Sequence, residues 1–107
     1  MPLNSAQPPK FPNFAPLMIR SYKIIVKGKV QGVGYRFNAQ AAAHKYDLTG
    51  FAKNLPDESV LIHAEGREEN INKFIEWCYV GPRYSEVSEV SAEEQEVKGY
   101  QTFEIKR

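Results

Sequence analysis

The 107-residue chain contains a single cysteine, Cys78, and no long run of apolar residues. One thiol cannot form an internal disulfide, so packing alone must stabilise the fold, and a reducing compartment fits this composition. Neither a membrane-length apolar run nor a secretory leader is evident in the sequence. We therefore expect a cytoplasmic protein with no membrane partner.

The chain also has almost no excess of charge. Its 14 basic and 13 acidic side chains give a formal net charge of +1. Broad nucleic-acid-binding surfaces usually show a basic excess, so this balance argues against a nucleic-acid partner. It leaves room for one small anion site. Hydrophobic residues make up 42% of the chain, which is enough for one ordinary globular core.

Proline is concentrated at one end of the chain. Five of the seven prolines are Pro2, Pro8, Pro9, Pro12 and Pro16. Proline fixes its own φ angle and lacks an N–H donor, so neither helix nor sheet suits this segment. Residues 1–19 are predicted to form an extended tail and residues 20–107 the folded domain. A proline-recognition motif is a less favoured interpretation, and Met18 is a second candidate start site that the sequence leaves open.

From residue 20 onward, apolar residues recur at the spacings of strands and helices. β-Branched and alternating segments predict strands over residues 22–27, 49–54, 60–65, 87–95 and 100–106. Stripes with spacings of three and four predict helices over residues 35–46 and 68–80. Asp47 should end the first helix in the left-handed region, and Gly81-Pro82 should end the second. Lys98-Gly99 should form the turn between the last two strands.

This order of elements predicts the fold class. A β-α-β-β-α-β order with an extra strand favours an α+β, ferredoxin-like split β-α-β sandwich. In that arrangement, one antiparallel sheet packs both helices on the same face.

A glycine-rich segment joins the first strand to the first helix. It reads Gly28-Lys-Val-Gln-Gly-Val-Gly34-Tyr-Arg36. Glycines permit a sharp turn and close approach of backbone amides to a ligand, and the helix N-terminus adds unpaired donors. Arg36 could then bind phosphate oxygens bidentately. On composition and spacing alone, a tight turn followed by a solvated arginine remains the favoured interpretation.

These residues resemble the acylphosphatase signature Gly-x-Val-Gln-Gly-Val-x-Phe/Tyr-Arg. The matching positions are Gly28, Val30, Gln31, Gly32, Val33, Tyr35 and Arg36. A second family signature resembles Gly50-Phe-Ala-Lys-Asn54, followed by Val60 and Gly66. The resemblance covers residues 20–107, and two motifs in the right order make it specific.

The resemblance implies an enzyme that hydrolyses the carboxyl–phosphate bond of acyl phosphates without a metal or other cofactor. It implies that the phosphate is held by Gln31, Gly32, Val33, Gly34, Tyr35 and Arg36. It implies that Asn54 positions the attacking water. The substrate is then a small molecule, and we expect a monomer. Because the loop recognises phosphate, we also expect broad tolerance of the acyl group.

Three positions depart from the family pattern. Glu58 stands where the family usually has a turn glycine, which predicts a different turn type there. Asp47 replaces a common helix-ending glycine, and Ser85 stands where alanine is frequent. None of the three is a residue to which the family gives a chemical role.

Two other function classes share some of these features. The RNA-recognition fold shares this strand order, but the aromatic residues that it needs are missing from residues 60–65. A non-catalytic anion sensor would keep Arg36 without needing Asn54. His44 and His63 have no partner at metal-binding spacing, so they are interpreted as surface or structural residues. Cys78, on the apolar face of its helix, is predicted to be a buried small residue.

Overall fold

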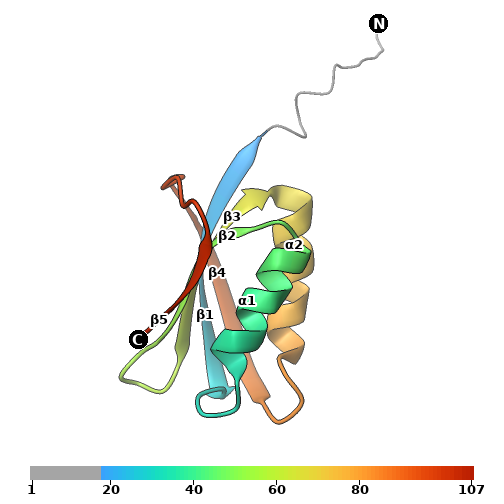
Figure 1. Cartoon of the computed structure of the whole chain (residues 1–107). Coiled ribbons are helices and arrows are strands. Elements are labelled where there is room, and N and C mark those ends of the chain that lie inside the picture. Colours follow the sequence, from blue (N-terminus) through green and yellow to red (C-terminus); the bar gives the residue numbers. More distant parts are fainter. Residues whose placement is uncertain (1–17) are drawn as a thin grey trace, which may run out of the picture.

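The computed structural model describes residues 18–107 as a five-stranded sheet with two helices on one face (Figure 1). The strand order in the sheet is β4-β1-β3-β2-β5. The strands are β1 (Ile19–Lys29), β2 (Thr49–Asn54), β3 (Val60–Arg67), β4 (Glu86–Gln95) and β5 (Phe103–Lys106). The helices are α1 (Tyr35–Lys45) and α2 (Glu68–Val80).

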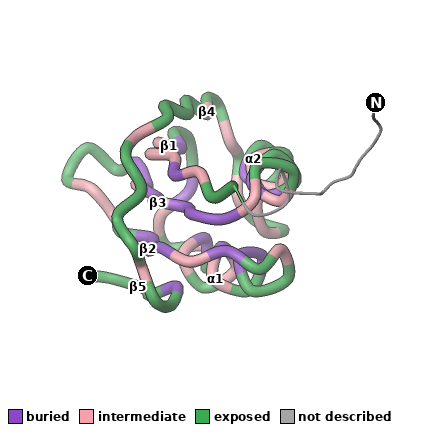
Figure 2. The backbone as a smooth tube through the Cα atoms, turned by 90° about the horizontal axis from the view of Figure 1, so that it is seen from above, coloured by how far each residue is buried: buried purple, intermediate pink, exposed green. Residues whose placement is uncertain are grey.

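The core lies between the sheet and the helices. Along β3, Val60, Ile62 and Ala64 are fully buried, whereas the alternate side chains Leu61 and His63 face the other side and are only half-buried. This period of two is the strand geometry that the sequence pattern predicted. Figure 2 shows the same division, with buried segments toward the helices and exposed backbone along the outer strand β4.

Both helices use the faces that their stripes predict. On α1 the buried residues are Tyr35, Ala39, Ala42 and Ala43. The small alanines bring this helix close to the sheet. After α1, Asp47 has a φ of 61°, which confirms its predicted left-handed conformation. Gly81 follows α2 with a φ of 68° and ends that helix as predicted.

The sheet is mixed, so the expectation of a wholly antiparallel sheet was wrong at one edge. β5 pairs with β2 in parallel, with Gly50 opposite Phe103. β4 and β5 therefore lie at opposite edges of the sheet, and Lys98-Gly99 is not a hairpin turn between neighbours. The segment over residues 96–102 instead crosses from β4 to the far edge of the sheet, where β5 pairs with β2.

A second correction concerns Glu58 in the β2–β3 turn. The residue has a φ of 74°, so the turn keeps the conformation that favours glycine instead of changing type. The Asp57 side chain accepts hydrogen bonds from the backbone N–H and the hydroxyl of Ser59, which supports the turn.

The predicted tail falls mostly outside the described part of the chain. Residues 1–17 are not described, and β1 begins at Ile19. Within residues 18–107, neither helix has the length and apolar character needed to cross a membrane.

Candidate active site

A small pocket lies where the N-terminus of α1 meets the ends of β2 and β5. Its volume is about 180 Å³. It is lined by Val30, Gly32, Gly34, Tyr35, Arg36, Phe37, Asn54 and Ile105. The pocket therefore joins the glycine-rich loop, the first turn of α1 and the end of β2, which are distant from one another along the chain.

The loop before α1 has the backbone shape of an anion-binding turn. Gly32 and Gly34 have φ values of 76° and 81°, in the left-handed region that other residues adopt at a cost. Gly34 is the N-cap of α1, and its carbonyl accepts bonds from the backbone and side-chain N–H groups of Asn38 at 3.0 and 2.8 Å. Among the backbone bonds described outside the regular elements, none is donated by the amides of residues 31–35. The first turn of a helix presents such donors to ligands.

The side chain of Gln31 points to the neighbouring hairpin. Its amide nitrogen donates to the carbonyl oxygens of Leu55 and Ser59, both at 2.9 Å. These bonds fasten the loop to the turn that follows Asn54. Of the residues expected to hold phosphate, Gln31 and Val33 are not among those that line the pocket. Only the backbone amide of Gln31 remains for a ligand.

Arg36 reaches across to the end of β5. Its Nη1 atom donates to the backbone carbonyl of Lys106 at 2.7 Å. No salt bridge of residues 18–107 includes Arg36, and residues 1–17 contain no Asp or Glu. The guanidinium is thus held in place by a neutral acceptor, and its further N–H donors are available to an anion.

Tyr35 lines the pocket, but its hydroxyl is engaged elsewhere. The side chain is 1% exposed, and its hydroxyl donates to the Cys78 carbonyl at 2.7 Å. Burial raises the pKa of this hydroxyl far above its usual value, so it does not ionise. Cys78 is fully buried, as predicted, and burial raises the pKa of its thiol to about 12. Neither group is suited to act as a nucleophile or base.

Asn54 is the last residue of β2 and lies opposite Val60 in the hairpin. Its side chain alternates onto the helix side of the sheet, the side that Ala52 also faces. At the strand end this side opens to the pocket, which Asn54 lines together with Arg36. The structure thus brings together Gly32, Gly34, Tyr35, Arg36 and Asn54 from two sequence motifs.

Three lining residues were missed by the sequence analysis: Val30, Phe37 and Ile105. Phe37 follows Arg36 but lies off the buried stripe of α1, and an aromatic residue at such a position is the one signal that could have found it. Ile105 belongs to a strand whose neighbour in the sheet was not predicted. The Lys106 carbonyl that holds Arg36 is a backbone group, so the residue type carries no signal.

The two histidines lie outside the pocket lining. His63 bonds through Nδ1 to the Tyr100 hydroxyl at 2.8 Å and packs on the Phe51 ring at 4.4 Å between centroids. Burial, together with Lys98, Lys23 and Lys106, lowers the pKa of His63 despite the opposing effect of Glu65. His44 is exposed on α1. Over residues 18–107, no group of three or more potential metal ligands was found.

Comparison with known proteins identifies the family. A family model described as acylphosphatase matches residues 22–105. The chain belongs to the acylphosphatase family. An acylphosphatase of Acaryochloris marina is 44% identical over 85 residues, which cover 79% of this chain and 91% of that protein. An acylphosphatase of Bacillus licheniformis is 45% identical over 85 residues, covering 78% and 94%.

Solved structures agree with this assignment. The crystal structure of the Bacillus subtilis acylphosphatase is 40% identical to this chain and superposes with a TM-score of 0.81. The match covers 84% of this chain and 100% of that one. The predicted acylphosphatase resemblance and the ferredoxin-like α+β fold are both confirmed. As an acylphosphatase, the chain is a hydrolase of acyl phosphates.

Proposed function

We propose that this acylphosphatase hydrolyses acyl phosphates to a carboxylate and inorganic phosphate, with the phosphate held by Arg36 and the loop amides and the water positioned by Asn54. One observation supports this division of roles above all others. Arg36 and Asn54 come from separate motifs, yet both line one small pocket beside a left-handed glycine turn.

The substrate itself makes the chemistry undemanding. An acyl phosphate is a mixed anhydride with a good carboxylate leaving group. The water oxygen forms a bond to phosphorus while the bond from phosphorus to the acyl oxygen breaks. The electron pair leaves with the carboxylate, and the proton of the water passes to phosphate oxygen or solvent. Catalysis of such a transfer rests mainly on positioning and charge stabilisation.

Arg36 is suited to the charged half of this task. Its Lys106 bond fixes the guanidinium at the end of β5, so little reorganisation is needed when phosphate arrives. A planar fork can contact two phosphate oxygens at once, and the backbone amides of the loop add donors from the other side.

Asn54 is suited to orienting the nucleophile. Its side-chain carbonyl accepts a hydrogen bond from the water, and its NH₂ donates to a phosphate oxygen. An amide does not titrate in the working range, so Asn54 acts as a positioning group at the reacting atoms and not as a general base.

Release of phosphate from acetyl phosphate, measured with a chelator present, tests the proposal. Removing one preorganised donor costs on the order of 10² to 10³ in rate, so Arg36→Ala should lose at least that much kcat/KM. Arg36→Lys should restore little, because a point charge cannot reproduce the fork. Asn54→Ala should lower kcat more than it weakens phosphate binding.

The matched control is Arg83→Ala, which removes an exposed arginine from the loop after α2. It should keep wild-type turnover. Full turnover by Asn54→Ala would contradict the water-positioning role. A wild-type protein that binds phosphate but leaves acyl phosphates to decay at their spontaneous rate would instead be an anion sensor.

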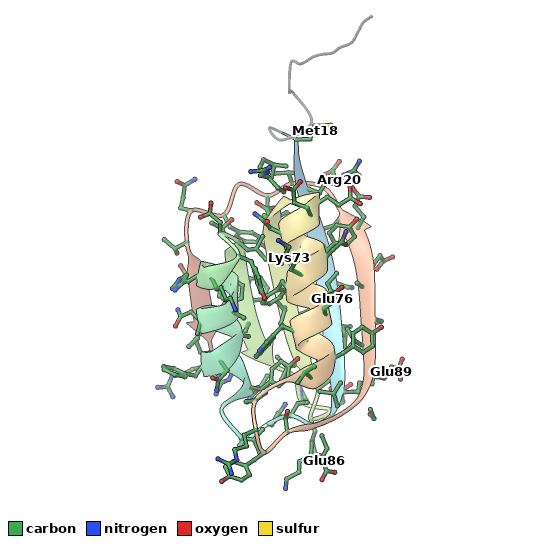
Figure 3. The ribbon with its side chains drawn as sticks, turned by 90° about the vertical axis from the view of Figure 1, so that its right-hand side faces the viewer. Met18, Arg20, Lys73, Glu76, Glu86 and Glu89 are labelled. Carbon is green, nitrogen blue, oxygen red and sulfur yellow. The ribbon has the colours of Figure 1, made fainter. Side chains whose placement is uncertain are left out.

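The proposal extends to a cytoplasmic monomer. The edge strand β4 presents Glu86, Glu89 and Glu93 to solvent, and Figure 3 shows Glu86 at the lower end of the strand and Glu89 on its outer side. Two copies pairing along this edge would bring like charges together, which disfavours association. Light scattering should give the monomer mass of 12.2 kDa, and cell fractionation should recover the protein with cytoplasmic markers. A dimer mass or a membrane-bound fraction would contradict this part of the proposal.

A further inference from the structure

Two exposed apolar side chains stand on the rim of the phosphate pocket. Phe37 is 68% exposed and Ile105 is 39% exposed, and both line the pocket that contains Arg36 and Asn54. They come from different elements, since Phe37 is in the first turn of α1 and Ile105 is in β5.

Core packing does not account for Phe37. The buried stripe of α1 consists of Tyr35, Ala39, Ala42 and Ala43, and Phe37 lies off it. Large aromatic side chains contribute stability when they are buried, and this one leaves most of its surface in water. An exposed apolar side chain alone needs no explanation, but one beside a polar site is a candidate for ligand contact.

Ile105 lies where it can contact the same ligand as Phe37. β5 runs parallel to β2, with Ile105 opposite Ala52, so its side chain is on the helix side of the sheet. The next residue, Lys106, holds Arg36 through its carbonyl. The same strand end that fixes the guanidinium therefore also presents an apolar surface next to it.

The lining of the pocket offers different groups to the two halves of the substrate. Arg36, Asn54 and the glycine turn present polar groups suited to a phosphate. Phe37 and Ile105 line the same pocket and present apolar groups suited to the acyl part.

We infer that Phe37 and Ile105 form an acyl-group subsite that makes the enzyme select acyl phosphates with an aromatic or branched apolar acyl group over acetyl phosphate. The inference rests on the proposed function and narrows the broad acyl tolerance that the sequence analysis expected. Apolar area removed from water stabilises the complex in proportion to the area, so a methyl group gains little from this rim and a phenyl ring gains more.

Kinetic selectivity tests this inference. We would measure kcat/KM for benzoyl phosphate and for acetyl phosphate with wild type, Phe37→Gln and Ile105→Thr. The two acyl phosphates differ in intrinsic reactivity, so the quantity that matters is the change in their ratio between proteins. Each variant should lower the benzoyl-to-acetyl ratio by about fivefold to tenfold, near the low end of what contacts in an enclosed apolar pocket contribute, because this rim is open to water. Glutamine keeps helix propensity and threonine keeps strand propensity, so the variants should fold.

A matched control is Tyr79→Gln. Tyr79 is also an exposed aromatic side chain on a helix, at 58%, but it is not among the residues that line the pocket. The benzoyl-to-acetyl ratio of kcat/KM for Tyr79→Gln should equal that of wild type. If Tyr79→Gln lowered the ratio as much as Phe37→Gln, the selectivity would not belong to the rim.

Binding of phosphonates separates failure of the inference from failure of the proposed function. Phenylphosphonate and methylphosphonate are not hydrolysed, so their dissociation constants do not depend on turnover. Wild type should bind phenylphosphonate about tenfold more tightly, and Phe37→Gln should remove most of this preference. Equal binding of the two phosphonates, with an unchanged kinetic ratio in both variants, would overturn the subsite. Absence of any phosphate release would overturn the proposed function, and the phosphonate pair would still decide the subsite.

Discussion

The two ends of the sheet use the same chemical groups, an arginine and a cluster of backbone amides, with different partners. At the end away from the pocket, the Glu65 carboxylate accepts hydrogen bonds from the amides of Lys98, Gly99 and Tyr100. Burial alone would raise the pKa of Glu65, but these amides and Ser21 outweigh it and lower the pKa. At the pocket end, no carboxylate among residues 18–107 accepts a hydrogen bond from the amides of the glycine turn.

The arginines differ in the same way. Arg20 forms salt bridges with Glu68 at 3.0 Å and Glu94 at 2.7 Å, and Glu94 is the main cause of its raised pKa. Arg36 bonds only to a neutral carbonyl among the described residues. The chain supplies its own anions where the groups are structural. None of the residues that line the pocket is an Asp or a Glu, which is the arrangement that the proposed site for an external anion requires.

A carboxylate placed in the pocket should have the largest effect on activity, because it gives Arg36 an internal anion like those of Arg20. Asn54→Asp replaces the NH₂ donor by a negative oxygen of almost the same size. It would pair with Arg36 and repel the phosphate, so we expect kcat/KM for acetyl phosphate to fall by on the order of 10³. Asn54→Ala, which adds no charge, should lose less.

The control for this variant is Asn72→Asp, which makes the same change on the exposed side of α2. Phosphate release should be unaffected there. Retention of more than about a tenth of wild-type kcat/KM by Asn54→Asp would mean that local charge does not govern the pocket.

Glu65→Gln removes the carboxylate at the end of the sheet away from the pocket and so tests its contribution to stability. Glu65→Gln should lower the free energy of unfolding at neutral pH by about 2 kcal/mol, because hydrogen bonds to a charged acceptor are lost. Glu104→Gln, on the exposed face of β5, should change little. Urea denaturation measures both, and turnover of acetyl phosphate by Glu65→Gln should stay close to wild type.

The contribution of Glu65 to stability should depend on pH in one direction. The pKa of Glu65 is lowered in the folded state, so its contribution is complete above the unfolded value of about 4.3 and is lost as pH falls through the folded pKa. The difference in unfolding free energy between wild type and Glu65→Gln should therefore become smaller as the pH falls. A gap that stayed constant down to about pH 2 would show that packing rather than charge causes it.

The sequence predicted most of the fold because burial is periodic along single elements. The alternation of Val60, Ile62 and Ala64 and the alanine stripe of α1 are local patterns, and both appear as expected. The parallel pairing of β5 with β2 was not predictable in this way. Alternation shows which side of a strand is buried but does not identify the strand beside it.

The residues of the site were likewise predictable only where a local motif identifies them. Motif residues such as Arg36 and Asn54 could be named because their types and spacing carry the signal. The side chain of Gln31 was expected near phosphate, yet it bonds to carbonyls that the sequence does not distinguish from any others. The Lys106 carbonyl and the rim residue Ile105 enter the site only through the unpredicted position of β5.

Gln31 at the pocket end is comparable to Glu65 at the other end, since the side chain of each joins two segments that are distant in the sequence. Gln31→Leu removes two hydrogen bonds while the Leu55 and Ser59 carbonyls keep backbone donors. We expect a loss of about 1.5 kcal/mol in unfolding free energy. Because the loop is then less well fixed to the turn after Asn54, kcat should fall about tenfold.

Gln101→Leu is the matched control, because this glutamine makes one exposed bond to the Gly99 carbonyl at the opposite end. Denaturation and phosphate release should both stay near wild type. A Gln31→Leu protein with lower stability but unchanged kcat would show that the bonds hold the hairpin without positioning the site.

The smallest expected effect comes from relieving backbone strain at one residue near each end of the sheet. Glu58, in the turn beyond Asn54, and Asp47, after α1, both have positive φ values, 74° and 61°. The left-handed region is costly for a glutamate and milder for an aspartate, whose short side chain tolerates it better. Glu58→Gly should therefore raise the free energy of unfolding by about 1 kcal/mol, and Asp47→Gly by less. Denaturant midpoints should increase in that order with unchanged slopes, while kcat/KM stays near wild type. Equal gains at both positions would mean that residue type does not set the strain. A loss of activity in Glu58→Gly alone would mean that the strained turn helps to hold Asn54 in place.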